Sequence, residues 1–104
     1  MAGVDYAQVR ALIGMAEGLR LIGFESVEAS GDELRGPCLI HGSTSASSRS
    51  FSANLRKQTF RCFKCGAMGN QLDLWVEVSK LPIHAAARDL CERAGVGVPE
   101  VRRW

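Results

Sequence analysis

Cys62-Phe-Lys-Cys65-Gly66, together with Cys38-Leu-Ile-His41 earlier in the chain, is the stretch that determines the fold. Each pair places two ligand atoms within reach of one ion, and a hairpin within the intervening residues 42–61 can bring the pairs together. Zinc accepts three thiolates and one imidazole in a closed tetrahedron, which leaves no position for a catalytic water. Gly66 permits the positive φ that such a turn requires. We therefore predict one structural Zn²⁺, held by Cys38, His41, Cys62 and Cys65.

The cysteines and histidines have other possible roles. Two disulfides are one alternative, but a cytosolic chain keeps its thiols reduced. Buried core cysteines beside an incidental histidine are another, and the glycine after the second pair argues against it. Cys91 shares helical spacing with Leu90 and Ala94, so it is predicted to be a small core residue and not a fifth ligand. His84 lies in the first turn of the same helix and is expected to be exposed.

Length and composition bound the class of protein. The chain has 104 residues, of which 46% are hydrophobic and 23% charged, and this predicts one globular domain over residues 1–104. That length excludes a large enzyme with separate cofactor and substrate domains. No apolar run approaches the ~18 residues of a membrane span. Asp5 and Glu17 stand where a signal peptide would be basic or apolar, so a cytoplasmic location is expected and no membrane partner.

The N-terminal part, residues 4–24, has apolar residues at helical spacing. Gly14 weakens this pattern, and two short helices with a break there are expected. A ribbon is predicted to follow over residues 25–69. Its expected strands, two before the serine-rich loop and two after it, cover about 25–29, 33–37, 50–55 and 59–63. The serine-rich loop itself, residues 42–50, is expected to be mobile.

A pair of helices is predicted over residues 70–95, before a short tail over 96–104. Asn70, with Asp73 three residues later, is typical of a capped helix start. Pro82 is expected to open the second helix and Gly95 to end it. The whole is an α+β zinc ribbon, with a small antiparallel β-sheet flanked by helices.

Charge is distributed unevenly along the chain. Residues 1–33 carry two basic and six acidic side chains, a balance of −4, whereas residues 34–72 carry six basic and none acidic. A stretch of one sign predicts an electropositive face, although an ordinary solvated surface is the alternative. If Phe51 and Phe60 face the core, alternation turns Arg61 and Phe63 outward. Cations on that face would engage phosphates, and the ring would stack on bases. The predicted nucleic-acid contacts are Arg49, Arg56, Lys57, Arg61, Phe63 and Lys64.

Two alternatives within this set stay open. Phe63 could pack against the zinc-binding turn instead of a base. Arg56 and Lys57 could simply be solubilising residues of a turn.

Three motifs carry a resemblance to a known family. They are Cys38-x2-His41, Ser50-Phe51-Ser52 and Phe60-Arg-Cys62-Phe63-Lys-Cys65-Gly66-Ala-Met-Gly69-Asn-Gln-Leu-Asp73. Together they resemble the Cys-His-Cys-Cys zinc-binding domain of bacterial DnaG-type DNA primases, and the likeness continues to Ala94-Gly95-Val96. The resemblance implies a zinc ribbon that contacts single-stranded template DNA and helps to select where primers start, while a separate domain polymerises.

Three classes of function are compatible with these features. The favoured one is a zinc-dependent module that binds single-stranded DNA in replication or primer initiation. The alternative is a protein–protein adapter in a replication or mobile-element complex, docking through the ribbon and Trp104. The acidic residues are scattered and form no two-metal cluster, so primase activity is expected only with a catalytic domain or partner outside this chain. The expected protein partners are such a catalytic domain, a helicase, or another replication or mobile-element protein.

Overall fold

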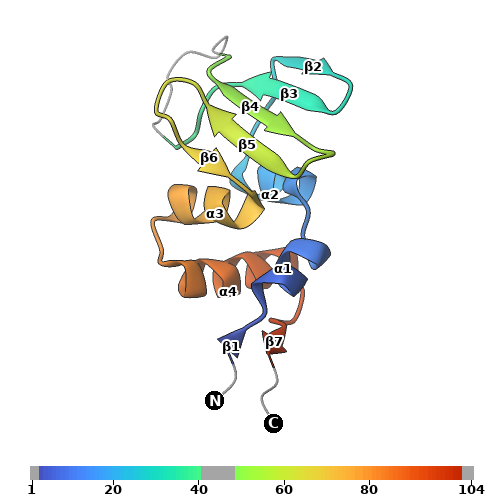
Figure 1. Cartoon of the computed structure of the whole chain (residues 1–104), viewed down its shortest axis with the longest axis vertical. Helices are drawn as coiled ribbons and strands as arrows, with labels where there is room; N and C mark the ends of the chain where they lie inside the picture. Colours follow the sequence, from blue (N-terminus) through green and yellow to red (C-terminus); the bar gives the residue numbers. More distant parts are fainter. Residues whose placement is uncertain (1–2, 41–48, 102–104) are drawn as a thin grey trace.

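The computed structural model describes residues 3–40 and 49–101 of an elongated molecule measuring 50 × 27 × 22 Å. His41, Trp104 and most of the predicted serine-rich loop lie outside the described residues. Helices and strands follow in the order β1 (Gly3–Val4), α1 (Tyr6–Leu12), α2 (Met15–Ile22), β2 (Glu28–Ser30), β3 (Glu33–Gly36), β4 (Phe51–Asn54), β5 (Thr59–Cys62), β6 (Met68–Gly69), α3 (Gln71–Ser79), α4 (Ile83–Ala94) and β7 (Glu100–Val101) (Figure 1).

The predicted helix starts and stops are confirmed. α1 and α2 are separate helices, and Gly14 between them has an extended backbone and is the N-cap of α2. At α3, the Asn70 side chain accepts the main-chain N–H groups of Leu72 and Asp73, while the Asp73 carboxylate accepts that of Asn70. This reciprocal box satisfies N–H groups that have no partner inside the helix. α4 follows Pro82 and ends at Gly95.

Five strands form one antiparallel sheet in the order β2-β3-β4-β5-β6. The α+β zinc-ribbon fold class is thereby confirmed. β2, the first strand of this sheet, begins at Glu28, whereas the predicted strand began at about residue 25. Val27 N–H still donates a hydrogen bond to the carbonyl of Arg35. β6, at the opposite edge, was not predicted, because a two-residue strand has no alternation to detect.

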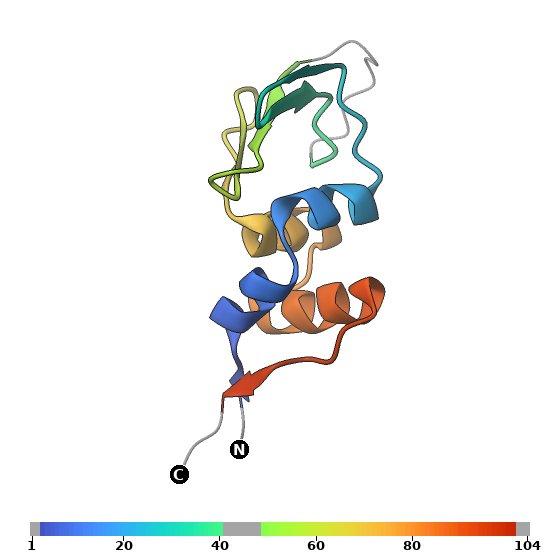
Figure 2. The ribbon, with the colours of Figure 1, turned by 90° about the vertical axis from the view of Figure 1, so that its right-hand side faces the viewer.

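The molecule is layered, with the sheet at one end and the helices below it. Figure 2 shows the sheet above α2 and α3, with α1 and α4 beneath them. The inner face of the sheet contributes Phe51, Ala53 and Phe60 to a core that α2 completes with Met15 and Leu19. Phe51 and Phe60 stack with their ring centroids 5.7 Å apart.

A second core lies between α1, α3 and α4. α3 belongs to both cores, since Leu74 packs under the sheet while Leu72 and Trp75 pack toward α4. Gln71, at the start of α3, is buried, and its side-chain Nε2 donates to the carbonyls of Arg10 and Ile13. α3 therefore holds the helical half against the ribbon half.

The two outermost strands pair far from the sheet. β1 and β7 form an antiparallel ladder that matches Gly3 with Val101 and Val4 with Glu100. Figure 1 shows this ladder at the opposite end of the molecule from the five-stranded sheet. The tail after Gly95 returns to this ladder along the helical half.

Candidate metal centre and outer sheet face

Three of the four predicted metal ligands meet at one point. The Sγ atoms of Cys38, Cys62 and Cys65 all lie within 4.8 Å of one another, with Cys38 and Cys62 buried and Cys65 exposed. Thiolates at the usual zinc–sulfur distance in a tetrahedron are about 3.8 Å apart. The cluster is therefore of the right size and chemistry for a zinc ion, and a small contraction would complete the contact.

The turn after β5 is built to present sulfur. Gly66 N–H donates to the carbonyl of Cys62 at 3.0 Å, and Gly66 takes a φ of 79°, which few other residues adopt without strain. Cys65 N–H lies 3.4 Å from the Cys62 sulfur. Burial of Cys62 opposes ionisation, yet hydrogen bonds from the backbone of Cys65 and Lys64 lower the pKa of its thiol below the usual value. A lower pKa raises the fraction of thiolate, the form that binds metal.

Cys91 and His84 lie away from this cluster. Cys91 is fully buried in the core between α1, α3 and α4, and burial raises the pKa of its thiol. His84 is exposed in the first turn of α4. Both predictions are confirmed. The fourth predicted ligand, His41, lies outside the described residues.

The outer face of the sheet carries a continuous row of residues across all five strands. Strand register aligns Glu28, Arg35, Ser52, Arg61 and Met68 in that order. The adjacent row, which includes Ala53 and Phe60, points into the core. The predicted alternation is confirmed, with Arg61 and Phe63 exposed on the outside.

Phe63 follows β5 and is the aromatic group of this face. Its side chain is 57% exposed, and it lies in neither core cluster of the described residues. The guanidinium carbons of Arg35 and Arg61 lie 5.0 Å and 5.1 Å from the ring centroid. Such cation–π contacts orient a ring without burying it. Phe63 therefore belongs to neither core, and its stacking on a base stays a prediction.

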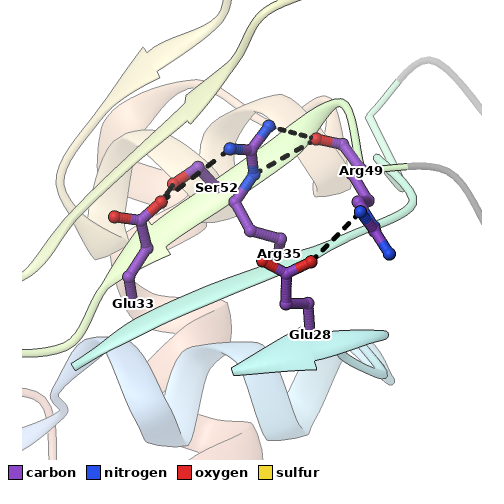
Figure 3. Close-up of polar contacts among 5 residues, drawn as sticks. All are labelled: Glu28, Glu33, Arg35, Arg49 and Ser52. Carbon is purple, nitrogen blue, oxygen red and sulfur yellow. Dashed lines mark hydrogen bonds and ion pairs between the residues drawn. The ribbon is translucent and has the colours of Figure 1, made fainter. Parts of the chain in front are cut away.

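Arg35 lies on β3, the second strand of the face, and was not predicted as a site residue. Its guanidinium donates twice to the main-chain carbonyl of Arg49, from Nη2 at 2.6 Å and from Nε at 3.2 Å, and lies 3.9 Å from the Glu33 carboxylate. Ser52 also donates to Glu33 (Figure 3). The only sequence signal for Arg35 was its place in the basic stretch, because its contact with Phe63 depends on strand pairing.

The other predicted cations differ in their surroundings. Arg49 forms an ion pair with Glu28 at 3.2 Å (Figure 3), so its charge is partly neutralised. Within residues 3–40 and 49–101, Arg61 and Lys64 form no ion pair, and both are exposed. Arg56 and Lys57 are exposed in the turn between β4 and β5, so the structure is compatible with either a solubilising or a binding role.

No helix in the described part of the chain has the length and apolar character needed to cross a membrane.

Comparison with known proteins agrees with the metal cluster and the fold. The DNA primase of Geobacillus stearothermophilus is 34% identical over 73 residues, which are 70% of this chain and 12% of that protein. The DNA primase of Treponema pallidum is 29% identical over 97 residues, or 92% of this chain and 16% of that protein. The chain thus spans less than a fifth of the length of these relatives.

A solved structure shares the architecture. The crystal structure of the Aquifex aeolicus primase, described as its zinc-binding and RNA polymerase domains, matches with a TM-score of 0.73. The match covers 92% of this chain and 23% of that one, at 24% sequence identity, and it shows a common fold. The family described as CHC2 zinc finger matches residues 21–103. Because that match covers most of the chain and includes all three clustered cysteines, the protein belongs to the CHC2 zinc-finger family of DnaG-type primases.

Proposed function

We propose that this chain is a zinc-stabilised module that binds single-stranded template DNA through the outer face of its sheet. The observation that carries the proposal is the exposed Phe63 ring beside two guanidinium groups. A ring that is already oriented and solvent-accessible offers a stacking platform worth ~1–3 kcal/mol per base. Neighbouring Arg61 and Lys64 supply cations for the phosphates on either side.

The metal supports this face without taking part in chemistry. We propose His41 as the fourth ligand beside Cys38, Cys62 and Cys65. Four protein ligands would close the coordination sphere. The ion would then hold the turn after β5 against the segment that follows β3. Because Phe63 and Lys64 lie inside that turn, zinc binding would also fix the positions of these two residues. Their contacts with DNA would then require less ordering on binding.

The relatives named above are DNA primases, and this chain corresponds to a small part of each. We propose that its role in priming is template recognition, with primer synthesis performed by a catalytic domain or a partner protein. Within the described residues, the only group of three or more candidate metal ligands is the cysteine cluster. The purified chain, given template, nucleotides and magnesium, should therefore make no primer.

Fluorescence anisotropy with a short labelled oligonucleotide tests the proposal. Arg61→Gln should weaken binding at low salt and reduce the dependence of log Kd on log salt by about 0.7, the contribution of one phosphate contact on a single strand. Arg88→Gln is the matched control, because Arg88 is exposed on α4 and the change in net charge is the same. Equal affinity of Arg61→Gln and Arg88→Gln, with zinc retained in both, would reject the outer face as the DNA site and favour the adapter function.

A further inference from the structure

A shallow groove lies on the outer face, where β4, β5 and β6 pair. Its volume is ≈ 500 Å³, within the range of about 300–1,000 Å³ typical of sites for small ligands. Its lining residues are Ser52, Asn54, Thr59, Phe60, Arg61, Met68 and Gly69. The lining contains one cation and no carboxylate, so its charge suits a segment of nucleic acid.

The Asn54 side chain is held in one orientation at the end of this groove. Its Oδ1 accepts the main-chain N–H groups of Arg56 at 3.0 Å and Lys57 at 2.8 Å. Two N–H donors at one atom identify that atom as the oxygen, so the other branch of the amide is the NH₂ group. This NH₂ group has no hydrogen-bond partner among the described residues. It is a donor whose direction is fixed before any ligand arrives.

The remaining walls suit a flat, partly apolar group. Met68 is 62% exposed at the edge strand, which is unusual for a long apolar side chain, and its thioether is adaptable and packs well against aromatic rings. Thr59 is exposed next to Asn54 through the strand register, and its hydroxyl can donate or accept. Arg61 lines the groove and also contacts the Phe63 ring, so the groove continues directly into the proposed stacking platform.

We propose that this groove is a base-reading subsite, in which one unstacked base packs on Met68 and accepts a hydrogen bond from the Asn54 amide. The inference rests on the proposed binding of single-stranded DNA and adds selectivity to it. An NH₂ donor favours a base that presents a carbonyl at the contacted position over one that presents an amino group. Thymine and cytosine differ in this way, since O4 of thymine accepts where N4 of cytosine donates. Asn54 is therefore assigned a preference for thymine over cytosine.

Asn54→Asp is the decisive variant. The aspartate oxygen still accepts from the backbone of Arg56 and Lys57, so the turn is retained while the donor is replaced by an acceptor. The parent chain should bind oligo-dT about three- to tenfold more tightly than oligo-dC of equal length, as expected for one hydrogen bond. In Asn54→Asp this ratio should fall to one or invert. Thr59→Val, which keeps the shape of the side chain but removes the hydroxyl, should lower affinity for oligo-dT.

Two controls separate base reading from charge. Ser30→Asp adds the same negative charge on the same face, outside the groove, and should weaken both oligonucleotides without changing their ratio. An abasic oligonucleotide should bind the parent and Ser30→Asp weakly, because only phosphate contacts remain. Far-UV circular dichroism and zinc content establish that each variant is folded.

The inference is overturned if the dT-to-dC ratio is the same in the parent and in Asn54→Asp, or if abasic and thymine oligonucleotides bind the parent equally. The first result would leave the proposed function standing, provided that binding still depends on salt and on Arg61, whereas the second would also reject base stacking on Phe63. Loss of the proposed function would look different, because no oligonucleotide would then bind in an Arg61-dependent way.

Discussion

Gln58 accepts the main-chain N–H of Met15 through its side-chain Oε1, at 2.6 Å, and so joins the turn of the β4–β5 hairpin to the first residue of α2. Gly14, the N-cap of α2, has no side chain to satisfy that N–H group. Gln58 also donates to the carbonyl of Leu55 within its own turn, which fixes the direction of its amide. A residue of the ribbon therefore caps a helix of the other half.

Gln58→Ala should lower the free energy of unfolding by about 1 kcal/mol, since the N–H of Met15 loses the partner that caps α2. Chemical denaturation measures the change. Arg56→Ala, two residues earlier in the same turn and exposed, is the control and should stay within about 0.5 kcal/mol of the parent. A similar loss of unfolding free energy in the two variants would show that the stability depends on the turn as a whole and not on the cap that Gln58 provides.

Loss of a zinc ligand should affect the ribbon half first. Zinc binding in comparable small sites is worth ~10–16 kcal/mol and is coupled to folding. Cys62→Ser should release the metal and speed amide hydrogen exchange over β4 and β5. In the same variant α4, whose core contains no metal ligand, should exchange more slowly than these two strands. Elemental analysis and hydrogen exchange measure the two effects.

The companion variant for this experiment is Cys91→Ala, which should keep its zinc because Cys91 packs in the other core. Full zinc retention in Cys62→Ser, or zinc loss in Cys91→Ala, would contradict the assignment of the metal centre.

Removal of the charge at Glu28 should strengthen DNA binding. Glu28 neutralises Arg49 in the ion pair of Figure 3, and a neutral side chain would leave that guanidinium available to a phosphate. Glu28→Gln should raise affinity at low salt and steepen the salt dependence by up to about 0.7. Glu92→Gln, an exposed change of equal charge on α4, should do neither. An equal gain from both variants would indicate a general charge effect.

Alkaline pH should destabilise the helical half through Cys91. Burial raises the pKa of its thiol, so as pH passes the ordinary value of 9.0 the unfolded chain releases a proton that the native chain retains. Stability falls with pH wherever the native state binds more protons. Denaturation at pH 8 and pH 10 should show a smaller decline for Cys91→Ala than for the parent. An unchanged decline would assign the pH dependence to other groups.

Sequence patterns were sufficient to predict helix ends, strands and metal ligands where contacts between residues close together in the chain decide the structure. The capping pair Asn70 and Asp73, the glycine after Cys65 and the alternation around Phe60 each depend on neighbours within a few residues. Three of the four predicted ligands meet in the structure because Cys38 follows β3, Cys62 ends β5, and both strands pair with β4.

The missed features depend on contacts between distant residues. The place of Arg35 beside Phe63 follows from the register of three strands, and no pattern within β3 indicates it. The same is true of the ion pair between Glu28 and Arg49, which lie 21 positions apart in the chain (49 − 28). The electropositive face stays a prediction. That Glu28 and Glu33 lie beside Arg49 and Arg35 follows only from the fold.

The ladder between β1 and β7 determines how the molecule would carry mechanical load. Force applied at Gly3 and Val101 would open a two-residue antiparallel ladder from its end, breaking hydrogen bonds one after another instead of together. After that ladder opens, tension would pass into α1 and α4, whereas the zinc-binding turns lie at the other pole of the molecule. A pulling experiment should therefore record a first yielding step at low force that is insensitive to chelation of the metal.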